Sequence, residues 1–305
     1  MRFLLLLCLE VAIPVAGGVV RAVVRAAGGN LEFRYNSDAG VVTLYLLGLL
    51  GMAIFARSVG AVSLRGSLAP YRARGRRVLF GFVLGASFVV AVLLLDYLLL
   101  RWVGTAAWQP GLQRWDFSLA ARTLLALGVV ILIATAEECI FRGFAFNYLR
   151  SSGARSATVG AVFGSALLFA LAHHLFYDPK LMFTRSEGLL LTGVFFLGVL
   201  LAVVYLASGS LACAVGVHAG LLLVEIFARN KRTRLVLVSQ PAWWMGVNGD
   251  LRTAPAAWLQ IIALTLIVLW VERWARPLTA IEPPAPAPDG AVTGWRGWLE
   301  PRHGS

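Results

Sequence analysis

The sequence is poor in charged residues and in cysteine, and it has almost no lysine. Only 14% of its 305 residues are charged, whereas about a quarter of a soluble domain is charged. The three cysteines lie inside apolar runs without paired spacing, which argues against a disulfide framework and a cysteine-rich metal site. The sequence also lacks a glycine-rich phosphate loop, a His-Glu-x-x-His zinc motif and an internal repeat. These absences argue against a disulfide-rich domain, a nucleotide-binding domain with a phosphate loop, a zinc protease of the His-Glu-x-x-His type and a repeat protein.

Apolar residues make up 59% of the chain, and they are gathered into long runs. A run of about 17–25 apolar residues is long enough to span a bilayer as a helix. We therefore predict an all-α fold, a polytopic transmembrane helix bundle with about eight spans. The predicted spans are residues 3–24, 41–56, 78–100, 119–149, 156–176, 188–207, 211–228 and 256–273.

The chain divides into a bundle, residues 1–276, and a proline-rich tail, residues 277–305. The tail is predicted to be disordered because it has too little apolar surface to fold alone. Glu10 and Pro14 interrupt the first span, and the start of the chain is also similar to a cleavable signal peptide. A retained span is favoured because the apolar run resumes after Glu10.

Basic residues outnumber acidic ones by 27 to 15, which gives a formal net charge of +12. Most of the arginines lie between apolar runs, where they would face water and lipid headgroups, and no basic soluble domain is evident. Nucleic-acid binding is therefore not predicted. With eight spans the basic residues divide evenly between the two sides of the membrane, so the positive-inside rule does not decide the orientation. The dense basic loop at residues 57–77 favours a cytoplasmic N-terminus.

Two adjacent acids, Glu137 and Glu138, follow the strongly apolar run at residues 124–133. Ionisable groups within a membrane are costly and often mark function. Glu138 precedes Arg142 by four residues, the favourable order for an ion pair on a helix, while Glu137 is rotated from Glu138 by about 100°. One acid can therefore serve structure while the other faces a cavity. The alternative is that both acids only neutralise Arg142 and fix helix packing.

Two further apolar segments carry histidines. Phe169 and His173 share a helix face through their spacing of four residues, whereas His174 points elsewhere and is interpreted as interfacial. Measured from the turn between their helices, Glu137 and His173 lie ~21 Å and ~27 Å away at 1.5 Å per residue, so antiparallel neighbours carry them at similar heights. His218 joins them if the turn before its helix is recessed.

A glutamate and two histidines on separate helices support two kinds of chemistry. Glu137 and His173 can activate a water while His218 donates to an oxyanion. The same three side chains can instead bind a divalent metal such as zinc. The residue types leave both alternatives open, so no cofactor is assigned.

These residues resemble the motifs of the CAAX prenyl protease and bacteriocin-processing membrane endopeptidases. This group is also called the CPBP or Abi family, and it includes lysostaphin resistance-like proteins. The resemblance covers residues 119–228, and it includes the segment that precedes the last histidine. The motifs, in chain order, are Glu137-Glu138-x-x-x-Arg142, then Phe169-x-x-x-His173, then His218 in a Gly-Val-His-Ala context.

The resemblance implies an α-helical intramembrane endopeptidase with Glu137, His173 and His218 as its catalytic residues. Glu137 would activate the hydrolytic water with His173, and His218 would stabilise the oxyanion or the water. Glu138 and Arg142 would brace the helix, and Phe169 would be a further supporting residue. If a metal is bound, the three catalytic residues are its ligands. A metal-free glutamate mechanism is favoured over that alternative.

One position departs from the family pattern. Many members have asparagine four residues after the last histidine, and this chain has Leu222 there. Losing one oxyanion donor can lower the rate by ~10²–10³. The alternative function is therefore a catalytically inactive membrane scaffold or peptide-immunity protein on the same fold. A third hypothesis, an ion or proton transporter, lacks the paired broken helices that often mark transport sites.

The expected partners are the lipid bilayer and a peptide or protein substrate embedded in the membrane or docked on it. The basic residues comprise 25 arginines and two lysines, a usage that suggests a GC-rich bacterial genome. We therefore expect a multi-pass protein of the bacterial cytoplasmic membrane, for which prenylated substrates are not expected. The sequence does not assign the cleaved bond or the oligomeric state.

Overall fold

The computed structural model describes residues 2–9, 23, 26, 48–51, 54, 75–104, 106–107, 117–150, 155–176, 184–229, 236–237, 246 and 251–275. Apart from turns and one short strand pair, these residues are helical. The elements in chain order are α4 (Gly75–Trp102), β1 (Ala106–Ala107), α5 (Phe117–Glu138), a π-helical segment (Cys139–Phe146), α6 (Asn147–Arg150), α7 (Arg155–Phe176), α8 (Arg185–Ser208), α9 (Leu211–Arg229), β2 (Val236–Leu237), a 3₁₀ turn (Leu251–Thr253) and α11 (Pro255–Ala275). The two strands pair antiparallel.

The described helices coincide with the last six predicted spans. Two of them, Ser186–Ser208 and Pro255–Glu272, are long and apolar enough to cross a membrane, and Ala157–His173 and Leu211–Leu223 are shorter apolar helices. Most of the first two predicted spans and the tail at 277–305 lie outside the described residues. The all-helical class thus holds for the described residues apart from the strand pair, and the number of spans stays a prediction.

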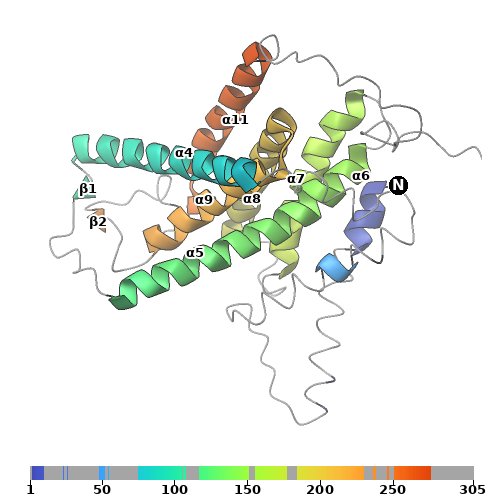
Figure 1. Ribbon diagram of the computed structural model, residues 1–305, viewed down its shortest axis with the longest axis horizontal. Helices are drawn as coiled ribbons and strands as arrows, with labels where there is room; N and C mark the ends of the chain where they lie inside the picture. The colour runs from blue at the N-terminus through green and yellow to red at the C-terminus, as the bar shows by residue number, and fades with distance from the viewer. Residues whose placement is uncertain are drawn as a thin grey trace, which may run out of the picture.

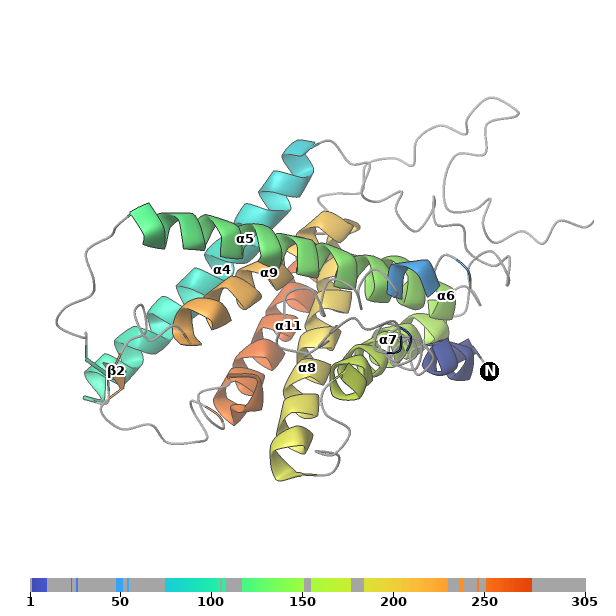
Figure 2. The same cartoon turned by 90° about the horizontal axis from the view of Figure 1, so that it is seen from below.

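Helices α4 and α9 run side by side, and α5 packs against α9 (Figures 1 and 2). Glycines allow the first of these contacts. A Cβ atom on Gly220 would lie 2.8 Å from the Cα of Ala86, and one on Gly85 would overlap the backbone of Gly216 and Val217. The two backbones touch where side chains would otherwise separate them, as in small-residue helix pairs of membrane proteins.

Helix α8 lies between α7 and α11 and contacts both. A Cβ atom on Gly198 would lie 2.9 Å from the Cα of Ala166 in α7. On the α11 side, the carbonyl of Arg252 lies against Gly193 and accepts a hydrogen bond of 2.8 Å from Trp258 Nε1. Helix α8 is therefore fixed on both sides by contacts that need a glycine.

The ends of α8 and the start of α11 have residues suited to their positions. The hydroxyl of Thr184 accepts a hydrogen bond of 3.3 Å from the backbone N–H of Glu187, as an N-cap does. Gly209 ends α8 at φ 59°, in the left-handed region where glycine carries no Cβ penalty. Pro255 begins α11, where its missing N–H costs nothing. Local sequence thus sets these boundaries.

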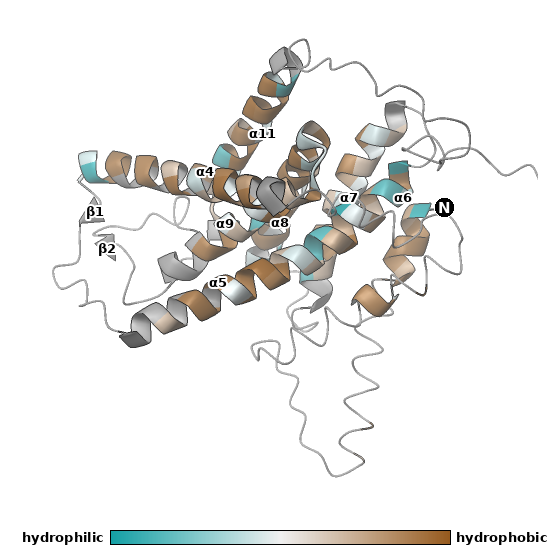
Figure 3. Ribbon diagram, in the orientation of Figure 1, coloured by the Kyte–Doolittle hydropathy of each residue, from teal (hydrophilic) through white to brown (hydrophobic). Residues whose placement is uncertain are grey.

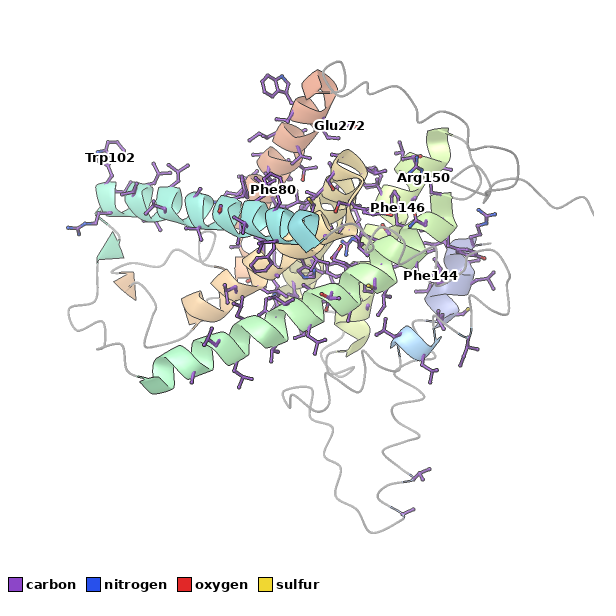
Figure 4. All side chains as sticks on the ribbon, in the orientation of Figure 1. Phe80, Trp102, Phe144, Phe146, Arg150 and Glu272 are labelled. Atoms are coloured by element: carbon purple, nitrogen blue, oxygen red, sulfur yellow. The ribbon has the colours of Figure 1, made fainter. Side chains whose placement is uncertain are left out.

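Large apolar side chains cover the outer faces of the bundle. Exposed leucines, valines and aromatic residues line α4, α5 and α11, which appear as hydrophobic ribbons in Figure 3. Trp102 is 86% exposed and extends outward from the far end of α4 (Figure 4). Exposed apolar patches of this extent mark surfaces that meet protein or membrane. Together with the apolar composition, they indicate an integral membrane protein.

The N-terminal helical residues 2–9 pack beside α6 (Figure 1). Leu6 is buried with Phe144 and Tyr148 in one apolar cluster. Arg2 donates a hydrogen bond of 3.3 Å to the carbonyl of Tyr148, and its guanidinium lies 5.4 Å from the centre of the Tyr148 ring. This part of the first predicted span therefore belongs to the packed bundle.

Candidate functional site

The two adjacent glutamates lie where the helix changes type. The sequence predicted one continuous span over residues 119–149, but α5 ends at Glu138 and a π-helix follows over Cys139–Phe146. Hydrophobic periodicity could not reveal this change, because almost every residue of the segment is apolar and buried. π-Helical turns are rare and occur frequently at functional sites.

Glu138 and Arg142 form the predicted ion pair inside the bundle. Arg142 Nη1 donates to Glu138 Oε1 over 2.9 Å, and neither side chain is exposed. Arg142 Nη2 donates over 3.0 Å to the carbonyl of Gly198 in α8. The guanidinium carbon also lies 4.5 Å from the centre of the Phe169 ring. Phe169 thus supports Arg142 through a cation–π contact, and one arginine joins the glutamate helix to α7 and α8.

The ring of His218 lies between the two carboxylates. Its Nδ1 is 2.9 Å from Glu138 Oε1, and its Nε2 is 3.4 Å from Glu137 Oε2. The ring is buried, as are both glutamates. His218 therefore joins the site from α9, as the sequence allowed, and the two glutamates reach it from different sides.

The contact with Glu138 fixes one hydrogen atom on His218. Glu138 accepts from Arg142, so it is the acceptor in its contact with Nδ1, and Nδ1 carries a hydrogen. The other ring nitrogen, Nε2, is thereby directed at Glu137.

His173 approaches Glu137 from α7. Its Nδ1 lies 2.8 Å from the carbonyl oxygen of Phe169, and because a carbonyl only accepts, Nδ1 is the donor. In the neutral ring Nε2 then presents a lone pair, and it lies 4.0 Å from Glu137 Oε1. The Phe169 ring also packs edge-on against His173, with ring centres 4.6 Å apart. Phe169 and His173 thus lie on one helix face, as predicted, and Phe169 orients the histidine ring.

The distance of 4.0 Å between His173 Nε2 and Glu137 Oε1 is one that a single water molecule can bridge. For a water ~2.8 Å from both Nε2 and Oε1, the angle at its oxygen between the two atoms would be about 90°. That angle is close to the angle between the two O–H bonds of water. Exposure differs within the group, at 21% for the His173 side chain, 5% for Glu137 and 1% for His218. His173 is therefore the most exposed of the three side chains.

Metal binding by the same side chains is a separate question. Within the described residues no group of three or more His, Cys, Asp or Glu side chains is arranged to hold a metal ion. Nδ1 of His218 faces a carboxylate, and such a partner also accompanies histidines that bind metals. Metal binding by Glu137, His173 and His218 therefore stays an alternative prediction.

Leu222, the position that departs from the family pattern, lies one helical turn beyond His218. It packs with Val130 and Ala134 of α5 in a small apolar cluster. Ala134 lies one turn before Glu138, so Leu222 is close to the site and presents no polar group to it. The side chain of His174 lies outside the described residues, and its interfacial interpretation stays a prediction.

The sequence reasoning missed residues that act through the backbone or through other side chains. Gly198 contributes only its carbonyl, and Asn147 holds two carbonyls of the π-helical segment. Arg252, on the 3₁₀ turn before α11, lies near enough to His173 to interact with it electrostatically. A single glycine, asparagine or arginine in a loop gives no motif by which it could be found.

The comparison with known families covers this same part of the chain. Residues 119–224 match the family model described as Rce1-like: Type II CAAX prenyl endopeptidase Rce1-like. The match extends from α5 into α9 and contains every residue of the glutamate and histidine cluster. No curated protein and no solved structure matches the chain.

Proposed function

We propose, from the premise that residues 119–224 form an Rce1-like domain, that this protein is an endopeptidase of the membrane. It would hydrolyse a peptide bond in a protein or peptide that is embedded in the bilayer or docked on it. The observation that carries the proposal is the buried Glu137 carboxylate, which faces Nε2 of His173 on one side and Nε2 of His218 on the other. That arrangement suits water activation by a general base.

The proposed reaction starts from a water held by Glu137 Oε1 and His173 Nε2. Glu137 takes one proton from the water as its oxygen attacks the carbonyl carbon of the scissile bond. His218 then donates through Nε2 to the oxyanion that forms, and stabilising an oxyanion is a large part of acyl-transfer catalysis. The proton on Glu137 passes to the leaving nitrogen as the carbon–nitrogen bond breaks. The amine and the carboxylic acid leave, and Glu137 is ionised again.

The remaining residues hold these groups in place. Glu138 accepts from Nδ1 of His218 and so directs the other ring nitrogen at the reacting centre. Arg142 neutralises Glu138 and is itself held by Gly198. The substrate would enter beside His173, the most exposed member of the group. A substrate that partitions into the bilayer fits this route, because the outer faces of the helices are apolar.

A catalytically inactive scaffold on the same fold is the competing proposal, and Leu222 is the observation in its favour. An asparagine at this position could donate to an oxyanion, whereas a leucine cannot. The intact glutamate and histidine contacts weigh against the scaffold. An inactive protein has no need of a buried carboxylate facing a lone pair on His173.

The test compares the wild type with Glu137→Gln, both in lipid nanodiscs. Each protein is incubated with a library of membrane-anchored peptides, and new termini are identified by mass spectrometry. The glutamine fills the same space and can still hydrogen-bond His218, so the variant is expected to fold normally. We expect cleavage by the wild type and a loss of about 10²–10⁴-fold in the variant.

Two controls make the result decisive. Thermal unfolding of both proteins shows that the variant is folded. Ser165→Ala is the matched control, because it removes another buried polar group, one that donates to the carbonyl of Val162 in its own helix. Equal cleavage by the wild type and a folded Glu137→Gln variant contradicts the proposal. No cleavage by either protein favours the scaffold.

A further inference from the structure

Asn147 is the first residue after the π-helical segment, and its side chain closes that segment. Nδ2 lies 3.2 Å from the carbonyl oxygen of Arg142, 2.8 Å from that of Gly143 and 3.2 Å from the hydroxyl of Tyr205. Carbonyls only accept, so the nitrogen of the amide must face them, and its two hydrogens are shared among the three oxygens. The orientation of the amide group is thus fixed by its neighbours.

The side chain adds a donor at the point where the helix changes type. The backbone N–H of Asn147 donates to the carbonyl of Phe144. In a regular helix the N–H of Asn147 would donate to the carbonyl of Gly143, and in a continued π-helix to that of Arg142. Both of those carbonyls accept from the amide of the Asn147 side chain. Polar backbone groups need hydrogen-bond partners within a bilayer, so this amide stabilises the change from π-helix to α-helix.

Tyr205 connects the same point to α8. It follows Gly198 by seven residues, which places both on one face of the helix. Gly198 holds the Arg142 side chain through its carbonyl, and Tyr205 holds Asn147 through its hydroxyl. The Tyr205 ring also packs edge-on against Phe146, with ring centres 5.7 Å apart. Helix α8 is therefore hydrogen-bonded to this part of the chain at two points, Arg142 and Asn147.

The register of the segment matters for the site. A π-helical turn holds more residues than an α-helical turn, so converting this segment to α-helix would rotate α5 relative to α6. Each residue of an α-helix corresponds to about 100° of rotation. Glu137 and Glu138 lie directly before the segment, and their carboxylates would turn away from the two histidines.

We propose that Asn147 and Tyr205 are positioning residues, which hold the π-helical segment in register and thereby aim Glu137 and Glu138 at the two histidines. Neither residue touches the reacting atoms. The inference about register stands on hydrogen bonds within the bundle, and its effect on turnover rests on the proposed peptidase function.

The test is hydrogen exchange by mass spectrometry on wild type, Asn147→Leu and Tyr205→Phe in nanodiscs. Leucine has the same branched side-chain skeleton as asparagine, with methyl groups in place of its polar atoms, and phenylalanine removes only the hydroxyl of Tyr205. We expect amides of Cys139–Asn147 to exchange about tenfold faster in Asn147→Leu, the factor for roughly one lost hydrogen bond. Tyr205→Phe should shift the same amides less. Peptides from α11 should be unchanged, and Ser165→Ala should leave the segment as in the wild type.

Turnover provides the second measurement. If the protein is a peptidase, kcat of Asn147→Leu should fall about 10²-fold with KM within twofold, because a small misplacement of catalytic groups acts on the chemical step. Exchange within twofold of wild type in Asn147→Leu overturns the proposal. If that variant does not fold, unchanged exchange in Tyr205→Phe overturns it. If the wild type cleaves none of the peptides but Asn147→Leu still exchanges faster than wild type, the result would support the register and contradict the peptidase.

Discussion

Replacing Arg142 by methionine is expected to destabilise the bundle strongly. The change removes the bond to Glu138, the bond to the Gly198 carbonyl and the contact with the Phe169 ring. Methionine preserves much of the volume, but Glu138 would stay buried with His218 as its only hydrogen-bond partner among the contacts described above. Breaking a buried ion pair in this way costs about 3–5 kcal/mol. The free energy of unfolding should fall by that amount.

The reasoning predicts a specific coupling. Glu138→Gln alone should also be costly, because it leaves the buried Arg142 without its direct ion-pair partner. The double variant removes both charges, so it should be more stable than the sum of the two losses implies, by at least about 2 kcal/mol. The measurement is reversible unfolding in mixed micelles, followed by tryptophan fluorescence. Arg101→Met, at an exposed position on α4, is the control and should change stability little.

Additive losses in the double variant would refute the argument, since they would mean that the two charges do not stabilise each other. A loss below about 1 kcal/mol in Arg142→Met would refute it as well, because surface ion pairs reach that value without burial.

Three further predictions follow from the packing and the chemistry of the site. Gly198→Ala should push α8 away from α7, because the new Cβ would lie 2.9 Å from a backbone atom of α7. Its midpoint of thermal unfolding should be lower than that of the control Gly188→Ala, whose Cβ would meet nothing within 4 Å, and equal midpoints would contradict the close packing. Leu222→Asn should raise kcat, measured on the peptides that the wild type cleaves, because it adds a donor near the oxyanion; an unchanged or lower kcat would argue against that role. Chelators should leave turnover unchanged, and a loss that added zinc restores would show that Glu137 and the histidines act through a metal.

The spacing of side chains along single helices predicted contacts that the structure contains. The pair Glu138 and Arg142 followed from a separation of four residues, and the structure contains it at 2.9 Å. The common face of Phe169 and His173 followed in the same way and appears in their hydrogen bond and ring contact. His218 was harder, since its place depended on a turn between helices. Spacing within one helix is set by backbone geometry, whereas meetings between helices depend on packing.

The sequence could not indicate the π-helical segment or its partners. A run in which nearly all residues are apolar has no face by which an extra residue per turn could be detected. The carbonyl of Gly198 is a backbone group, present at every residue, so its role appears only when α8 is placed. His218 also lies nearer to Glu137 than His173 does, at 3.4 Å against 4.0 Å. Counting helical rise along single helices could not give that order.

The glycine contact between α4 and α9 extends the packed bundle beyond the residues that match the family model. Helix α4 lies outside the matched residues 119–224, yet its backbone rests against Gly216 and Gly220, on either side of His218. A fragment cut to the matched residues would leave this bare backbone groove without the helix that fills it. The matched region is therefore smaller than the packed bundle, and a transplanted or minimised version needs α4 as well, together with α11 and residues 2–9, which also pack on it.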